Sequence, residues 1–174
     1  MKALQEVFGR VDAPAINAAQ LLEEATIKSD QEFQDPKGEV LSFAHLKDQM
    51  NELTMSMISL GVVAGDKVLI HALGYRDALL VFLAAEQLGV NVINLGEQPL
   101  EIVPIKDHRA RLLIASKLTE GFSAKEKEVR SCEFLVERES SADTMSEALS
   151  WNQFTRLSKY TTEWELERFR VIEA

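Results

Sequence analysis

The stretch Lys67-Val-Leu-Ile-His-Ala-Leu-Gly-Tyr-Arg-Asp-Ala-Leu-Leu-Val-Phe-Leu-Ala-Ala-Glu-Gln-Leu-Gly-Val-Asn-Val-Ile-Asn-Leu95 decides the fold of this 174-residue chain. Near its start, Val68 to Ile70 is a short apolar run that follows the turn signal Gly65-Asp66. This order predicts a buried strand. Near its end, residues 90–95 are mostly apolar and β-branched, and they predict a second buried strand.

The residues between these two strands predict a helix. Its body, residues 78–88, is apolar almost all the way round, so we expect the rest of the fold to cover it on more than one side. Asp77 can cap the helix at its N-terminus, and Gly89 can end it. Strand, helix and strand with short connections form a βαβ unit, and its crossover should be right-handed.

Composition and charge exclude several classes of protein. With 46% hydrophobic and 27% charged residues, the chain has the profile of a soluble globular domain, with little room for a second one. Its net charge of −9 argues against nucleic acid as a partner. No apolar run is long enough to span a membrane, and the N-terminus lacks a signal-peptide core. A single cysteine, Cys132, fits a reducing compartment, so we expect a cytoplasmic location.

Before the βαβ unit we expect a surface helix over residues 15–27 and then a β-hairpin. Its strands should be residues 32–34 and 39–41, on either side of the turn Asp35-Pro-Lys-Gly38. Ser42 should begin a longer helix that ends at Gly61. Apolar residues along this helix recur at spacings of four and three, which indicates a face packed in the core: Leu46, Met50, Leu53, Met57 and Leu60.

After the βαβ unit, residues 99–109 predict a helix that Pro104 would bend or shorten. Residues 112–115 and 134–136 are apolar runs that predict two more buried strands. Several βαβ-type units in succession predict an α/β fold in three layers, with a mainly parallel sheet.

The segments nearer the C-terminus are more polar. Residues 125–130 should form the solvated face of a helix, and residues 140–146 should be a polar linker. Trp151 and Phe154 should anchor the chain back onto the body, which gives an α/β domain over residues 1–155. The charged tail, residues 156–174, is predicted to be helical because Thr162 and Glu165 have the spacing of a capping box. A strand is the alternative, because Trp164, Leu166, Phe169 and Val171 also fit strand alternation with one slip.

Several segments follow one another in an order that a known family shares: Leu41-Ser-Phe-Ala-His-Leu46, Leu60-Gly-Val-Val-Ala-Gly-Asp-Lys-Val68, Leu80-Val-Phe-Leu-Ala-Ala-Glu-Gln-Leu-Gly-Val90, Arg109-Ala-Arg-Leu-Leu-Ile-Ala115 and Ala148-Leu-Ser-Trp-Asn-Gln-Phe154. Together they resemble the opening of the adenylate-forming (AMP-binding) superfamily of acyl-CoA synthetases, firefly luciferase and the adenylation domains of peptide synthetases. The resemblance covers residues 15–155 and implies an N-terminal subdomain of that fold. It also implies a family that activates acids with ATP and Mg²⁺ and passes them to CoA or a carrier protein.

The chain departs from this family where the chemistry resides. The family's activity depends on a phosphate loop rich in Ser, Thr and Gly, on an acidic hinge and on a lysine of a C-terminal lid, and the sequence contains none of these. Its eight glycines form neither a dinucleotide fingerprint nor a P-loop. His45 stands where the family usually has a capping Glu, and Asn94-Leu-Gly96 stands where it has Pro-x-Asn. We therefore expect no catalytic residue and no cofactor for this chain alone.

Other catalytic constellations are also missing from the sequence. His45, His71 and His108 are widely separated and have no metal-binding spacing, so no metal site is predicted. His71 ends a buried strand, where a core histidine with satisfied hydrogen bonds is the simpler interpretation. Cys132 has no identifiable base partner and should be inert.

If a ligand binds, it belongs at the carboxyl ends of the parallel strands. The loops there are residues 71–75, 94–97 and 116–119, and the resemblance implies that loops in this part of the fold help to hold CoA. Acidic neighbours make the charge of this edge mixed, so ordinary connecting loops are the simpler interpretation. The candidate cofactor-binding residues are Asn94, Gly96 and Lys117.

Three functions are compatible with the sequence. The chain could be a free-standing, non-catalytic subdomain of an adenylate-forming protein, or one part of a split or truncated acid-activating ligase. It could also be a partner-binding α/β module unrelated to acid activation. An isolated subdomain would expose apolar surface, so we expect a protein partner or a homo-oligomer to cover that face.

Overall fold

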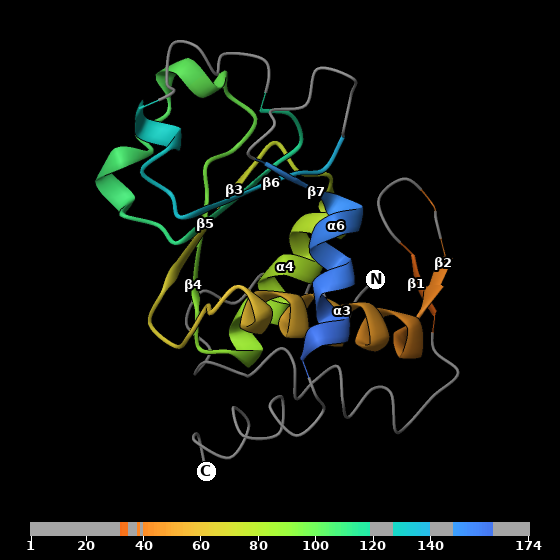
Figure 1. Ribbon diagram of the computed structural model, residues 1–174. Helices are drawn as coiled ribbons and strands as arrows, with labels where there is room; N and C mark the ends of the chain where they lie inside the picture. The colour runs from red at the N-terminus through yellow and green to blue at the C-terminus, as the bar shows by residue number, and fades with distance from the viewer. Residues whose placement is uncertain (1–31, 35–37, 39, 119–126, 140–147, 162–174) are drawn as a thin grey trace, which may run out of the picture.

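The computed structural model describes residues 32–34, 38, 40–118, 127–139 and 148–161 (Figure 1). The predicted helix over residues 15–27, the predicted linker and the predicted helical tail from residue 162 lie outside these residues. In chain order the elements are β1 (Glu32–Gln34), β2 (Val40–Ser42), α3 (Phe43–Ser59), β3 (Lys67–His71), α4 (Tyr75–Gln87), β4 (Asn91–Asn94), η1 (Leu100–Ile102), η2 (Lys106–His108), β5 (Leu112–Ala115), β6 (Phe134–Glu137), β7 (Leu149–Ser150), α6 (Trp151–Arg156) and η3 (Leu157–Tyr160).

Five parallel strands form the main sheet, in the order β4-β3-β5-β6-β7. Within it, Val68 of β3 lies opposite both Val92 of β4 and Leu112 of β5. The chain passes from β3 to β4 through α4 and then returns to the other side of β3 as β5, so the sheet is doubly wound. The predicted α/β fold with a mainly parallel sheet is confirmed.

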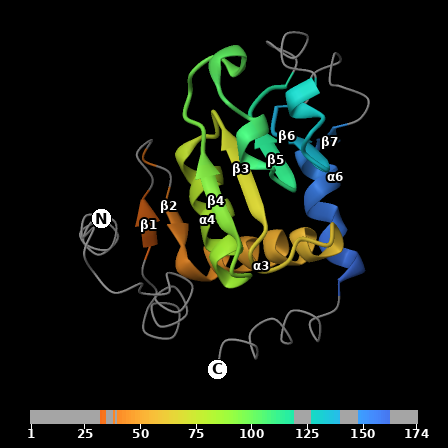
Figure 2. The same ribbon diagram turned by 90° about the vertical axis from the view of Figure 1, so that its left-hand side faces the viewer.

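The predicted hairpin is also confirmed, with its second strand shifted by one residue. β1 and β2 pair antiparallel and form a two-stranded sheet of their own. Figure 2 shows this hairpin apart from the main sheet, where β2 leads into α3.

The βαβ unit forms, but the start of its helix and the burial of its second strand differ from the prediction. β4 is an edge strand of the sheet, and its four side chains are half-buried or exposed, so the predicted buried strand is wrong in this respect. α4 begins at Tyr75 with Gly74 as its N-cap, so the predicted cap at Asp77 is wrong. Asp77 lies instead in the first turn, where a negative charge is favourable next to the helix N-terminus. Its carboxylate accepts a hydrogen bond from Nε of Arg138 at 2.8 Å. Gly89 has φ of +65°, the left-handed conformation that often follows a helix end.

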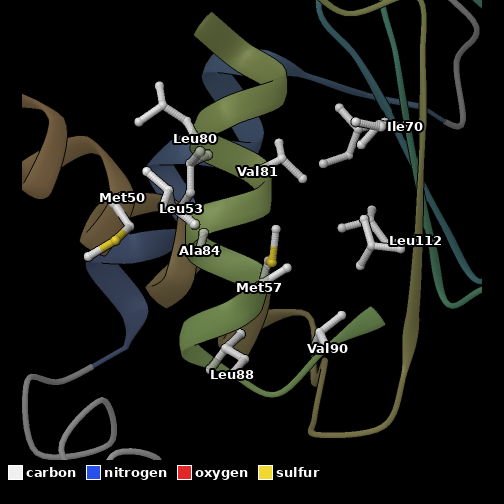
Figure 3. Packing of buried hydrophobic residues seen from close by; sticks show 14 of the residues in the cluster. Met50, Leu53, Met57, Ile70, Leu80, Val81, Ala84, Leu88, Val90 and Leu112 are labelled. Atoms are coloured by element: carbon white, nitrogen blue, oxygen red, sulfur yellow. The ribbon is translucent and has the colours of Figure 1, made fainter. Parts of the chain in front are cut away.

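The predicted apolar stripe of α3 packs into the core beside α4. Four of its five side chains are fully buried and Leu60 is half-buried: Leu46, Met50, Leu53, Met57 and Leu60. In Figure 3, Val81 points from α4 toward Ile70 and Leu112 of the sheet. α4 therefore contacts both the sheet and α3, as its apolar surface requires.

The ends of α3 follow the sequence signals. Oγ of Ser42 accepts a hydrogen bond from the N–H of His45 at 3.2 Å, which fixes the predicted start. Gly61 follows the helix with φ of +71°, a conformation that favours glycine and that turns the chain toward β3.

Shorter segments cover the opposite face of the sheet, so the fold has three layers (Figure 1). The predicted helix over residues 99–109 is wrong, because two short 3-10 helices, η1 and η2, stand there instead. Pro104 explains the interruption. The residue before a proline is pushed toward extended backbone, and Val103 has φ of −86° and ψ of 131°. Proline also has no N–H with which to continue a helix.

α6 and η3 pack across α3. Phe154 is fully buried in the same core as the α3 stripe, and the ring of Trp151 meets it edge-on at 5.9 Å, so the predicted anchor is confirmed. Oγ of Ser59 donates a hydrogen bond to the carbonyl of Leu157 at 2.9 Å. Across the residues that the structure describes, no helix is long and apolar enough to cross a membrane.

Candidate functional site

The fold marks one edge of the sheet as a candidate site. After the carboxyl end of β3 the chain continues into α4, which covers one face of the sheet. After β5 it continues toward the other face, where Leu118 is buried in the second core. In doubly wound sheets, ligands bind in the crevice outside such a switch point. The loops that meet here are residues 72–74 after β3 and 116–118 after β5, with residues 95–98 after β4 beside them.

Asn94 and Gly96 form a tight turn at this edge. Oδ1 of Asn94 accepts a hydrogen bond from the N–H of Gly96 at 2.9 Å, and Gly96 has φ of +77°. The carbonyl of Gly96 accepts the N–H of Ala72 at 2.9 Å, which ties the turn to the end of β3. The side chain of Asn94 therefore stabilises its own loop. Gly96 faces open space, because a Cβ placed there would have no atom within 4 Å.

Lys117 lies at the same edge but on the other side of β3, after β5. β4 and β5 are two strand spacings apart, about 10 Å, so the three candidates do not form one cluster. Nζ of Lys117 is 3.6 Å from Oε2 of Glu139, and Oγ of Ser116 donates to Oε1 of that carboxylate at 2.9 Å. Glu139 thus offsets the lysine's charge. The role of Asn94, Gly96 and Lys117 in cofactor binding stays a prediction.

His71 is buried at the end of β3, as predicted, but only one of its ring nitrogens has a partner. Nε2 lies 2.7 Å from the carbonyl oxygen of Gln98, whereas Nδ1 is buried without a hydrogen bond. The next residue, Ala72, has φ of +51°, which is uncommon for a residue that carries a Cβ. The imidazole thus joins the loop after β4 to β3, and its role in these contacts is structural.

Sequence analysis did not predict the contacts of Arg138, which join three elements near this edge. Arg138, just after β6, donates to Asp77 of α4 at 2.8 Å, and its guanidinium lies 5.1 Å from the centre of the Trp151 ring. One side chain therefore joins α4, β6 and α6. Arg138 and Asp77 are 61 positions apart in the sequence, so no local pattern predicts the pair.

Glu137 is the second residue that the sequence did not single out. It is 0% exposed at the end of β6, and its Oε1 accepts the N–H of Leu118 at 2.9 Å, whereas its Oε2 has no partner. Burying a carboxylate is unfavourable unless hydrogen bonds compensate for lost water. Its one hydrogen bond holds the loop after β5, so Glu137 is a positioning residue of this edge.

The remaining candidates do not assemble into a catalytic group in the described part of the chain. His45 is exposed on α3, His108 is half-buried in η2, and no three metal-ligating side chains there could hold an ion. Cys132 is buried, and this burial raises the pKa of its thiol to about 11. A thiol that stays protonated is a weak nucleophile. In the described part of the chain, Cys132 is therefore not an activated nucleophile.

Comparison with known proteins identifies the class of fold. The sequence matches no protein-family model, and no curated protein is significantly similar to it. Among solved structures, the anthranilate CoA ligase AuaEII in complex with anthranoyl-AMP has a TM-score of 0.66 and 22% identity, over 83% of this chain and 29% of its own. A coronafacic acid ligase from Pectobacterium brasiliense has a TM-score of 0.65 and 14% identity, over 81% of this chain and 29% of its own. VinN has a TM-score of 0.57 and 18% identity, over 82% of this chain and 34% of its own.

This chain therefore has the α/β fold of one part of the adenylate-forming ligases. At these identities the likeness concerns the fold, and it confirms the resemblance that the sequence motifs indicated. The chain spans about a third or less of the length of these structures.

Proposed function

We propose that this chain is the N-terminal α/β subdomain of an acid-activating, adenylate-forming protein, and that these 174 residues alone do not form an acyl adenylate. One observation carries the proposal. The likeness to AuaEII covers 83% of this chain but 29% of that ligase, so most of the architecture of a complete ligase has no counterpart here.

The sequence supports the second half of this proposal. A phosphate loop binds ATP through successive backbone N–H groups and a lysine, and it needs glycine and hydroxyl residues for that geometry. The phosphate loop of the adenylate-forming superfamily ends in Pro-Lys-Gly. The same tripeptide, Pro36-Lys-Gly38, stands in the sequence between β1 and β2, but Glu32-Phe-Gln-Asp35 precedes it in place of a run of Ser, Thr or Gly. A triphosphate would therefore find no backbone cradle in this sequence.

The test is ATP–pyrophosphate exchange by the purified chain, with anthranilate and with a long-chain fatty acid as the acid. We expect labelled ATP no higher than in a blank without protein, and a complete CoA ligase assayed in the same buffer serves as the positive control. Exchange that depends on the acid and disappears when the chain is heated would contradict the proposal.

Native mass then separates the two ways in which a non-catalytic subdomain could work. We would measure it on untagged protein purified gently from its own cells. Co-elution with a larger polypeptide that carries a phosphate loop would support a split ligase, and exchange should then appear in that complex. A single species that contains this chain alone, or its homodimer, would support a free-standing module.

A further inference from the structure

A cavity lies near the edge of the sheet opposite to the candidate site, where β6 begins. This cavity is a pocket partly open to solvent, and its volume of about 450 Å³ lies within the range of small-molecule sites. Its walls come from Leu60 just after α3, from η3, from β7, and from the start of β6 with the residues just before it. The side chains that make these walls are mostly apolar: Leu60, Cys132, Phe134, Leu135, Leu149 and Leu157.

The cavity follows from the shortness of the edge strand. β7 has two residues and pairs with Val136 and Glu137, so among the residues that the structure describes no strand pairs with the start of β6 on that side. Phe134 belongs to the core under α3 and α6, whereas Leu135 belongs to the core on the other face of the sheet. The space therefore opens where the two cores meet, and apolar groups from both face into it.

The two charged residues that line the cavity do not favour a charged ligand. Arg130 and Glu133 also line it, both are exposed, and the carboxylate of Glu133 is already 3.2 Å from Nη1 of Arg111. In the wall itself, the side chain of Cys132 is buried, and this burial raises the pKa of its thiol.

We propose that this cavity binds small, uncharged molecules built on an aromatic ring or a short alkyl chain. Apolar walls favour such a ligand because its apolar surface leaves water on binding. The site is independent of the proposed function, since it lies at the other end of the strands from the switch point.

Cys132 offers a direct readout, because it is the one cysteine of the chain and lines the cavity. Purified protein would be treated with iodoacetamide at increasing concentrations of indole, and the alkylation rate would be followed by intact mass. We expect indole to slow alkylation several-fold and to saturate. Benzoate, which has a ring of similar size but carries a charge, should protect less at the same concentration.

A cavity-filling variant shows whether indole acts at this place. In Leu157→Phe the larger side chain should occupy the space, so that indole no longer changes the alkylation rate. Leu149→Phe serves as a second filling variant if the first does not fold. Leu73→Phe makes the same chemical change in the loop after β3 and should respond to indole as the unmodified chain does.

Three results would overturn this proposal. Indole could leave the alkylation rate of the unmodified chain unchanged, it could protect the folded filling variants equally well, or benzoate could protect better than indole. None of them would bear on pyrophosphate exchange, so the two proposals fail separately.

Discussion

Cys132 gives the stability of the fold a defined dependence on alkaline pH. Burial raises the pKa of its thiol from 9.0 to about 11, so the folded chain holds this proton more tightly than the unfolded chain does. The contribution is fully present below pH 9 and is lost as pH rises toward 11. We therefore expect the free energy of unfolding, measured in urea, to fall across this interval.

Lysine and tyrosine residues also titrate in this interval, so the informative quantity is a difference. In Cys132→Ala the fall between pH 9 and pH 11 should be smaller, because the side chain has no proton to lose. Parallel pH profiles for the two proteins would show that the thiol is not buried in the folded state.

Two glycines near helix ends should respond to substitution in opposite directions. Gly61 follows α3 at φ of +71°, and a Cβ there would lie 3.1 Å from Nη2 of Arg111, so Gly61→Ala should lower the free energy of unfolding by about 1–2 kcal/mol. Gly74 is the N-cap of α4, without a side-chain hydrogen bond and with open space around it. Gly74→Ser adds a capping oxygen and should stabilise the fold by about 0.5 kcal/mol.

Urea denaturation of Gly61→Ala and Gly74→Ser measures these changes in the free energy of unfolding. Gly65→Ala is the matched control for Gly61→Ala. Gly65 has φ of +86° with no atom near an added Cβ, so it reports backbone strain without crowding. A larger loss at Gly65 than at Gly61 would show that Arg111 does not crowd the turn.

The elements that the sequence predicted well are those whose signals are local. The α3 stripe, its cap at Ser42 and the strand at residues 112–115 each depend on residues close in sequence, and they form as predicted. The helix over residues 99–109 failed because Pro104 outweighed a weak helical pattern. β7 is two residues long, too short to show an alternating pattern, and the sequence did not predict it.

The candidate edge could be predicted only in outline. Parallel strands place their carboxyl ends together, so the loop holding Asn94 and Gly96 and the loop holding Lys117 were found at one edge. The partners of these side chains come from elsewhere in the chain. Glu139, the partner of Lys117, lies 22 positions after it in the sequence. The ion pair of Arg138 with Asp77 joins two elements that only the fold brings together. No rule of sequence spacing predicts such pairs.

The two cores of the molecule share one sheet, so damage to one face should destabilise the other. Phe154 is buried among the residues under α3 and α6, whereas Cys132 is buried on the opposite face, and β6 contributes side chains to both cores. Phe154→Leu should lower the free energy of unfolding by about 1–2 kcal/mol. Trp164→Phe leaves Trp151 as the one tryptophan, so its fluorescence reports unfolding of the core under α3 and α6. Alkylation of Cys132 reports unfolding of the core on the opposite face. Both probes should shift together in urea, as two-state unfolding requires. A shift in fluorescence that leaves the alkylation midpoint unchanged would mean that each face unfolds as a separate unit.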